Sequence, residues 1–261
     1  MSEHILEINN LSKYFGGLAA VSECSLKVKK GTITGIIGPN GSGKTTLFNL
    51  IAGNLKSSSG SVLFNNENIT DVPSYELFSK GLLRTFQIAH EFTNLSVLEN
   101  LMMVPGNQSG EKLINALLKP SLVAKEESQI KEKAMEVVDF LNLSHLKNEL
   151  AGNLSGGQKK LLELGRTMMV DAKLVLLDEV GAGVNRTLLK DLGTAIEKLN
   201  KEKGYTFCMI EHDMDFIGRL CDPVIVMAEG SVLFEGTVED AKKDEKVIES
   251  YLGRGSKLKG N

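Results

Sequence analysis

The alternation of apolar and polar residues predicts a chain that begins with strands. The segment from Ile5 to Val28 is strand-like and interrupted by Gly16-Gly17, which predicts an antiparallel sheet at the start of the domain. From Thr32 to Ile37 the residues alternate and then become apolar, as in a buried strand. A glycine-rich loop and a helix from about Lys44 to Leu55 follow. Residues Ser61 to Phe64 predict one more short strand.

The region from about Ala89 to Met168 carries few strand signals and several helical ones. Ser96 and Glu99 form a capping-box pattern, which opens a helix. Further on, apolar residues recur at helical spacing, at Ile130, Ala134, Val137, Val138 and Leu141. This pattern predicts a helical lobe, residues 89–166, inserted into an α/β core.

The strand pattern resumes after the lobe. Leu174 to Leu177 are continuously apolar, as is typical of a parallel strand covered on both faces. A helical stripe from Leu188 to Leu199 and a strand from Tyr205 to Ile210 follow, and the segment from Val224 to Phe234 reads as a hairpin. Strands alternating with helices predict an α/β fold with a mostly parallel sheet. We expect one domain over 1–261, with its core at 1–88 and 167–253 and a flexible tail at 254–261.

Composition narrows the classes of function. The hydrophobic fraction of 42% is ordinary for a globular protein, and the net charge of −3 gives no support for a nucleic-acid partner. No apolar run approaches the roughly 20 residues of a membrane helix, and the N-terminus lacks a secretory signal pattern. Cys24, Cys208 and Cys221 are odd in number and lack metal-ligand spacing, which fits a reducing compartment. Work at a membrane would therefore require docking onto another protein.

A phosphate-binding loop is the first candidate for chemistry. The motif G-x-x-x-x-G-K-[ST] stands between the predicted strand and helix and comprises Gly38, Pro39, Asn40, Gly41, Ser42, Gly43, Lys44 and Thr45. Its glycines let backbone N–H groups approach phosphate oxygens, and the following helix adds partial positive charge. We expect Lys44 to reach the β- and γ-phosphates and the Thr45 hydroxyl to bind Mg²⁺. This motif alone indicates only a nucleoside triphosphate.

A second glycine-containing motif follows the helical lobe. Ser155 and Gln158 form a capping box at the start of a helix, but an ordinary cap does not require the intervening Gly156 and Gly157. Two glycines leave the helix N-terminus bare, so a phosphate could approach its N–H groups.

The segment Leu154–Gln158 resembles the signature motif of ABC ATPases, and Gly38–Thr46 resembles their phosphate loop. The resemblance to this family covers nearly the whole chain. The resemblance implies that Thr46 joins the ATP-binding residues. It also implies a dimer in which each ATP lies between the phosphate loop of one chain and Ser155 of the other.

Acidic residues close the next apolar strand. Asp178 and Glu179 end it, where α/β sheets bind ligands, and buried carboxylates without partners are costly. The resemblance implies that Asp178 holds Mg²⁺ and that Glu179 polarises the attacking water. His212, which directly follows Glu211 after the next strand, matches the histidine that contacts the γ-phosphate.

Two further residues carry roles only through the resemblance. Gln87 matches a glutamine that touches Mg²⁺ or the attacking water at the start of the lobe. Phe15 matches the aromatic residue that stacks on adenine, although either Phe15 or its neighbour Tyr14 could instead be core packing. Two positions depart from the family pattern: Val180 stands where proline is usual and Asn185 where many relatives have aspartate.

The details resemble one branch, the ATP-binding subunits of branched-chain amino-acid importers. The similar segments are Lys13–Leu18, Arg84–Gln87, Gly156–Lys160, Ala182–Asn185 and Val247–Gly253. The resemblance implies a cytoplasmic protein on the inner face of the membrane, partnered by a second ATPase subunit and two permease subunits. A substrate-binding protein would be an indirect partner.

Other functions stay open. Urea and short-amide importers use closely similar subunits, and a soluble ABC ATPase of an assembly complex would keep the same motifs. A small-molecule kinase does not explain Leu154–Gln158, and a binding module without catalysis does not explain Lys44, Asp178, Glu179 and His212.

Overall fold

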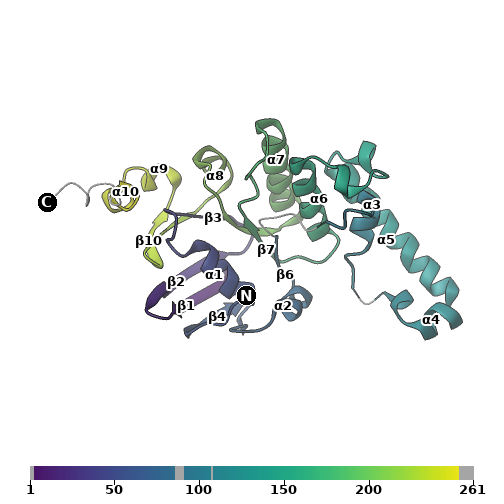
Figure 1. Ribbon diagram of the computed structural model, residues 1–261, viewed down its shortest axis with the longest axis horizontal. Coiled ribbons are helices and arrows are strands. Elements are labelled where there is room, and N and C mark those ends of the chain that lie inside the picture. The colour runs from purple at the N-terminus through teal and green to yellow at the C-terminus, as the bar shows by residue number, and fades with distance from the viewer. Residues whose placement is uncertain (1–2, 86–90, 107, 253–261) are drawn as a thin grey trace. The chain divides into compact units, whose positions relative to one another are not determined.

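The chain folds into two compact units (Figure 1). The computed structural model describes residues 3–85, 91–106 and 108–252. Unit 1 comprises residues 1–84, 173–181 and 196–261, and unit 2 comprises residues 85–172 and 182–195. The tail predicted at 254–261 lies outside the described residues.

Unit 1 begins with an antiparallel sheet, as the sequence predicts. Its strands, in spatial order, are β2 (Leu18–Lys29), β1 (His4–Phe15), β4 (Ser59–Phe64) and β5 (Glu67–Asn68). The long hairpin of β1 and β2 turns at Gly16-Gly17, where the strand pattern is interrupted.

The second sheet of unit 1 is parallel except at one edge. Its spatial order is β10 (Ser231–Gly236), β9 (Val224–Ala228), β3 (Ile33–Ile37), β8 (Thr206–Ile210), β7 (Leu174–Asp178) and β6 (Leu82–Arg84). Only β10 runs antiparallel to its neighbour, through the predicted hairpin. Every residue of β3, β7 and β8 is buried, which explains why these strands are largely apolar in sequence. The predicted α/β fold, with one antiparallel and one mostly parallel sheet, is confirmed.

Helix α1 (Lys44–Ile51) packs against both sheets of unit 1. Its Leu47 and Phe48 belong to one core cluster with Leu6 of β1 and Ile36 of β3. The helix ends at Ile51 rather than at about Leu55 as predicted. The chain turns at Gly53, where φ is +69° and a side chain would meet the Val72 carbonyl oxygen at 2.1 Å.

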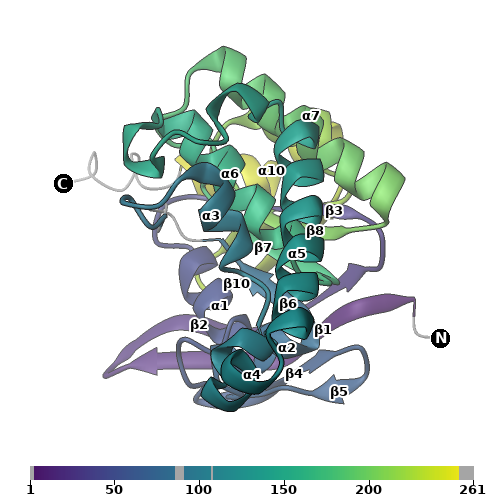
Figure 2. The same cartoon turned by 90° about the vertical axis from the view of Figure 1, so that its right-hand side faces the viewer.

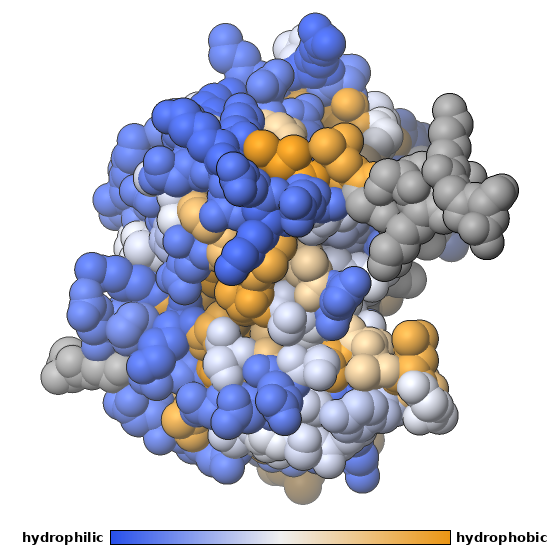
Figure 3. All heavy atoms as spheres, turned by 90° about the vertical axis from the view of Figure 1, so that its left-hand side faces the viewer, coloured by the Kyte–Doolittle hydropathy of each residue, from blue (hydrophilic) through white to orange (hydrophobic). Residues whose placement is uncertain are grey.

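Shorter helices complete unit 1. They are α2 (Ser74–Lys80), α8 (Met214–Leu220), α9 (Val238–Ala241) and α10 (Glu245–Leu252). Figure 3 shows the side of the molecule with α9, α10 and the β1–β2 hairpin, where apolar patches are interrupted by hydrophilic side chains.

Unit 2 is helical in its described part. It holds α3 (Val97–Met102), α4 (Leu113–Leu118), α5 (Pro120–Phe140), α6 (Gly156–Met168), three short 3₁₀ turns and the first part of α7 (Arg186–Lys203). The predicted capping box of Ser96 and Glu99 is present at the start of α3. The predicted stripe on α5 faces the interior at Ala134, Val137 and Val138. No helix in the described part of the chain is long and apolar enough to cross a membrane.

Candidate functional site

The predicted phosphate loop connects β3 to α1 in unit 1. Gly38, Gly41 and Gly43 have φ values of +147°, +77° and +100°, which favour glycine. A side chain at Gly38 would meet the Met227 carbonyl oxygen at 2.1 Å. One at Gly43 would meet the Ala20 carbonyl oxygen at 2.4 Å. The loop is thus held tightly between backbone segments of β2 and β9.

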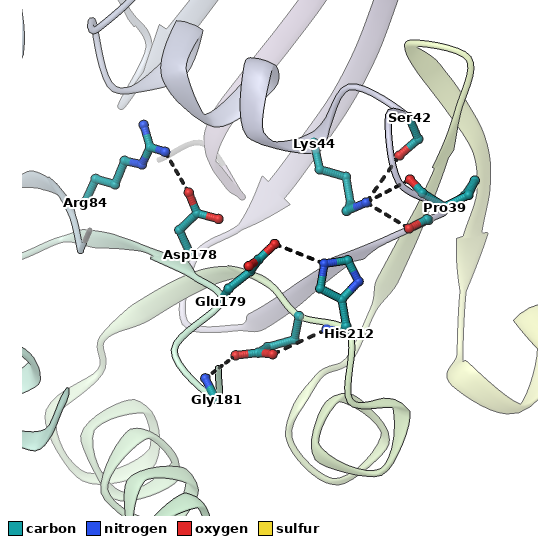
Figure 4. Close-up of polar contacts among 10 residues, drawn as sticks. Pro39, Ser42, Lys44, Arg84, Asp178, Glu179, Gly181 and His212 are labelled. Atoms are coloured by element: carbon teal, nitrogen blue, oxygen red, sulfur yellow. Dashed lines mark hydrogen bonds and ion pairs between the residues drawn. The ribbon is translucent and has the colours of Figure 1, made fainter. Parts of the chain in front are cut away.

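Lys44 lies inside this loop rather than in solvent. Its side chain folds back, and Nζ donates to the carbonyl oxygens of Gly38 at 2.8 Å and Pro39 at 3.0 Å (Figure 4). Ser42 Oγ lies 3.4 Å from the same nitrogen. Burial lowers the pKa of the Lys44 ammonium, and the nearby Glu179 and Asp178 carboxylates oppose that shift. The loop therefore holds a positive charge where phosphate oxygens would be received.

The rim of the loop is open while its inside is buried. Asn40, Gly41 and Thr45 are exposed, whereas Ser42 and Lys44 are buried. The Thr45 hydroxyl thus stands at the accessible start of α1. Thr46 is half-buried one residue further along the helix.

Asp178 ends β7 and is buried in an ion pair. Its Oδ2 lies 2.6 Å from Nη2 of Arg84, at the end of the neighbouring strand β6. Arg84 also donates through Nη1 to Asn49 Oδ1 of α1 at 2.6 Å. Charge pairing of this kind offsets the cost of burying a carboxylate. Sequence reasoning assigned Arg84 no role. The pattern that could have indicated one is a charged residue directly after two apolar strand positions.

Glu179 and His212 point toward each other from adjacent strands (Figure 4). Glu179 follows β7, and its Oε1 lies 3.0 Å from Nε2 of His212, two residues beyond β8. Glu179 has a φ of +47°, a conformation that side chains other than glycine adopt at a cost. Its amide donates to the Ile210 carbonyl at 2.9 Å, which helps to hold that conformation.

A buried carboxylate that sequence reasoning missed supports this pair. Glu211 is 5% exposed, and its Oε1 accepts from the amide of Gly181 at 2.6 Å. Its Oε2 lies 3.3 Å from the amide of His212. Burial raises the pKa of Glu211, against these two hydrogen bonds. One side chain thus ties the loop after Glu179 to the segment that carries His212.

The second motif begins α6 in unit 2, and the predicted capping box is present. Ser155 Oγ accepts from the Gln158 amide at 3.4 Å, and Gln158 Oε1 accepts from the Ser155 amide at 2.9 Å. The two glycines differ in their surroundings. A side chain at Gly156 would find its nearest neighbour at 3.8 Å, whereas one at Gly157 would meet Leu188 at 2.5 Å. The bare surface predicted for both glycines is therefore present only at Gly156, and Gly157 is required by packing.

The predicted adenine-stacking residue stands at the end of β1. Phe15 is 50% exposed and Tyr14 is 48% exposed, so neither ring is buried in the core. Lys13 Nζ lies 5.3 Å from the centre of the Phe15 ring. Gln87, the other residue assigned by resemblance alone, lies outside the described residues.

The candidate site residues of unit 1 thus gather at the carboxyl ends of three adjacent parallel strands. The loop after β3 carries Lys44, β8 leads to His212, and β7 ends in Asp178 and Glu179. This edge is where open α/β sheets bind ligands. A phosphate loop beside a buried acid and a carboxylate–histidine pair defines a P-loop nucleoside-triphosphate-binding protein.

Comparison with known proteins places the chain more closely. A family model described as ABC transporter matches residues 21–182. A probable branched-chain amino acid transport ATP-binding protein LivG of Archaeoglobus fulgidus is 44% identical over 249 residues, covering 95% of each chain. LivG of Escherichia coli is 33% identical over 253 residues, covering 97% of this chain and 99% of its own. The chain belongs to the ABC transporter family and is an ABC-type ATP-binding protein, similar to the branched-chain amino-acid branch.

A solved structure agrees with this placement. An ATP-binding cassette of an ABC transporter, determined in its ADP conformation, is 40% identical. It covers 97% of this chain and 100% of its own length, with a TM-score of 0.82.

Proposed function

We propose that this chain is the ATP-hydrolysing subunit of a membrane importer, with branched-chain or other hydrophobic amino acids as the transported class. The observation that carries the ATPase half is the convergence of Lys44, Asp178 and the Glu179–His212 pair at one sheet edge. The transport half rests on the names of the relatives, which are ATP-binding proteins of branched-chain amino acid transport.

In this proposal each side chain has a distinct task. The loop amides from Gly38 to Thr46 and the Lys44 ammonium bind the β- and γ-phosphates. Glu179 orients and polarises the attacking water, since its carboxylate is a hydrogen-bond acceptor beside the phosphate loop. His212 is held by Glu179 at 3.0 Å and contacts the γ-phosphate, where it stabilises developing charge. Phe15 stacks on the adenine from the exposed hairpin end.

The residues also fit a magnesium ion. Thr45 offers an exposed hydroxyl and Asp178 a carboxylate, and hard oxygen ligands are those that Mg²⁺ prefers. Gln87 is a further ligand in this proposal. When bound, the ion neutralises negative charge on the β- and γ-phosphate oxygens.

The N-terminus of α6 completes the site from a second subunit. Ser155, Gly156 and Gln158 present the start of a helix that ordinary packing does not cover at Gly156, so γ-phosphate oxygens can approach its amides. Gly157 supports this surface by letting α6 pack closely on Leu188. ATP binding would close two such chains together, and hydrolysis would release them.

We place the working subunit on the cytoplasmic face of the membrane, docked on two permease subunits that are served by a substrate-binding protein. Urea or short-amide import is the second candidate, since the transported molecule does not touch this chain. A soluble ABC ATPase of an assembly complex is the third.

ATP turnover tests the catalytic half. Purified chain should hydrolyse ATP in the presence of Mg²⁺, and Glu179→Gln should lower kcat by about 100-fold or more while ATP binding persists. The variant keeps the size and a hydrogen-bonding group at the position, so loss of ATP binding is not expected. Turnover that is unchanged in Glu179→Gln would refute the assignment of the water-polarising residue.

A pull-down from detergent-solubilised native membranes tests the transport half. Two multi-span permeases and an amino-acid- or amide-binding protein are the expected companions, and the binding protein would name the substrate class. Recovery of soluble partners alone would leave the ATPase assignment standing and refute the importer.

A further inference from the structure

Arg84 makes two short contacts to which the proposed function gives no task. Its Nη2 lies 2.6 Å from Oδ2 of Asp178 (Figure 4), and its Nη1 donates to Oδ1 of Asn49 at 2.6 Å. The side chain of Arg84 is 11% exposed and that of Asp178 is 2% exposed, so solvent ions screen this pair little. The guanidinium therefore belongs to the interior of unit 1 rather than to its surface.

The pairing of the strands explains why Arg84 reaches Asp178. Arg84 ends β6 and is the register partner of Leu176 on β7, two residues before Asp178. Because side chains alternate along a strand, Arg84, Leu176 and Asp178 extend from the same face of the sheet. Leu176 belongs to one core cluster with Leu47 and Phe48 of α1, so α1 covers this face. Strands β6 and β7 and helix α1 can be followed in Figures 1 and 2.

Asn49 connects the guanidinium to the helix that begins in the phosphate loop. It lies four residues after Thr45 on α1, and residues four apart lie on the same side of a helix. Thr45 is exposed and Asn49 is half-buried, whereas Phe48 and Leu50 on either side of Asn49 are buried. Arg84 thus bridges the strand end that carries Asp178 and the side of α1 that carries Thr45.

Thr45 and Asp178 are described residues that our proposal assigns to magnesium, so this inference rests on the proposed function. Their oxygens come from two separate elements, α1 and β7. Mg²⁺ requires near-ideal octahedral geometry, so a change in the spacing of these oxygens should weaken its binding. A guanidinium is a planar fork whose donors are fixed relative to each other, and it is therefore suited to hold two elements at a set distance.

We propose that Arg84 is a positioning residue that sets the spacing between Asp178 and Thr45 by bridging Asp178 to Asn49. Groups that orient metal ligands without touching the metal typically change metal affinity by about 10–100-fold. A cation that only neutralised Asp178 would not need the contact with Asn49, so that contact separates positioning from charge compensation.

ADP binding measured by calorimetry over a range of Mg²⁺ concentrations tests the proposal. This series gives the Mg²⁺ dissociation constant of the ADP complex, and ADP avoids both hydrolysis and the dimerisation expected with ATP. Arg84→Lys keeps the positive charge beside Asp178 but lacks the planar fork. It should raise the Mg²⁺ dissociation constant by about tenfold or more, while ADP affinity in EDTA stays the same.

A second variant removes the other end of the bridge. Asn49→Ala leaves the ion pair of Arg84 and Asp178 in place and should also raise the Mg²⁺ dissociation constant, which keeps the test available if Arg84→Lys does not fold. The rise should be smaller with Ca²⁺ in place of Mg²⁺, because Ca²⁺ accepts more irregular oxygen geometry. As a matched control, Lys80→Gln breaks another ion pair of 2.6 Å in unit 1, with Glu67, and should leave metal binding unchanged.

An unchanged Mg²⁺ dissociation constant in Arg84→Lys would overturn the proposal. An unchanged constant in Asn49→Ala would overturn it as well, since Arg84 would then act on Asp178 alone. An equal rise with Mg²⁺ and Ca²⁺ would assign the effect to charge and not to spacing. A wild-type chain whose ADP affinity does not respond to Mg²⁺ would instead refute the proposed magnesium site, and this inference with it.

Discussion

At the scale of single residues, the sheet edge with the proposed catalytic residues depends on a carboxylate, Glu211, to which our proposal gives no contact with phosphate. The Glu211 carboxylate accepts a hydrogen bond from the amide of Gly181. This hydrogen bond fixes the turn in which Glu179 has a positive φ. Because the pKa of Glu211 is raised, its carboxyl group binds a proton more tightly in the folded state than in the unfolded state. Ionisation of Glu211 therefore lowers the free energy of unfolding. As pH rises, the loss begins at the unfolded pKa near 4 and continues until pH passes the folded pKa.

Glu211→Gln is expected to remove that pH dependence while keeping an oxygen for Gly181. On acidification from neutral pH to about pH 4, the wild-type chain should gain stability relative to Glu211→Gln. Urea unfolding of both proteins across that range measures the difference directly. Parallel stability curves at all pH values would show that Glu211 does not titrate differently in the folded state.

The three cysteines should be chemically silent in the folded protein. All are buried, and burial raises the pKa of Cys24 to about 11 and of Cys208 to about 12; the pKa of Cys221 is raised as well. Only the thiolate reacts with alkylating reagents. Iodoacetamide at about pH 8, below the free-cysteine pKa of about 8.5, should modify none of them, as read by intact mass. Urea-unfolded chain is the control and should take up three labels, and fast labelling of native protein would contradict the buried placement.

Sequence reasoning singled out the proposed catalytic residues more readily than the residues that hold them in place. Asp178 ends a buried strand, and Glu179 and His212 each follow a buried strand within two residues, so the position of each could be predicted from local pattern. Arg84 pairs with Asp178 across 94 positions, and Glu211 reaches Gly181 across 30. Such pairs are created by strand order, which a single sequence does not specify.

At the scale of elements, the start of α6 separates two roles for adjacent glycines. Gly157→Ala would place a methyl group 2.5 Å from Leu188 and should destabilise the fold by about 1–3 kcal/mol. Gly156→Ala has open space and a better helix former, so stability should hold or rise slightly. In our proposal a methyl group at Gly156 faces the γ-phosphate, so ATP turnover should fall although the fold is intact.

Urea unfolding and steady-state ATPase assays on both variants separate these effects, with each serving as the control for the other. Equal stability of the two variants would contradict the packing role of Gly157. Full turnover in Gly156→Ala would contradict the approach of phosphate at that residue.

Elements that carry a strong local sequence signal were predictable, and short helices without one were not. The apolar runs of β3, β7 and β8 and the capping boxes of α3 and α6 are local signals that survive folding. Helices α2, α8, α9 and α10 have four to eight residues, which is too short for a helical period to stand out. After the end of α1 the chain turns at Gly53, where an added side chain would meet the carbonyl oxygen of the distant Val72, a constraint that local sequence does not show.

At the scale of the whole molecule, our proposal makes each ATP site composite: the phosphate loop of one chain and the start of α6 of another chain bind the same ATP. We therefore expect ATP to drive dimerisation, and Glu179→Gln to accumulate as the ATP-bound dimer because hydrolysis no longer reopens it. Light scattering after size exclusion, with and without ATP, measures the mass of the species. The wild-type chain should return to monomer as ATP is consumed.

Two second-site changes make that experiment specific to the composite site. In the Glu179→Gln background, Lys44→Ala should abolish dimerisation by removing the positive charge that holds the phosphates. Ser155→Arg should abolish it while leaving ATP bound to the monomer, because it alters only the surface offered to the other chain. A Glu179→Gln chain that binds ATP and stays monomeric would contradict a homodimeric site. Adding the chain of a second ATPase subunit and recovering the dimer would then assign the composite site to a heterodimer.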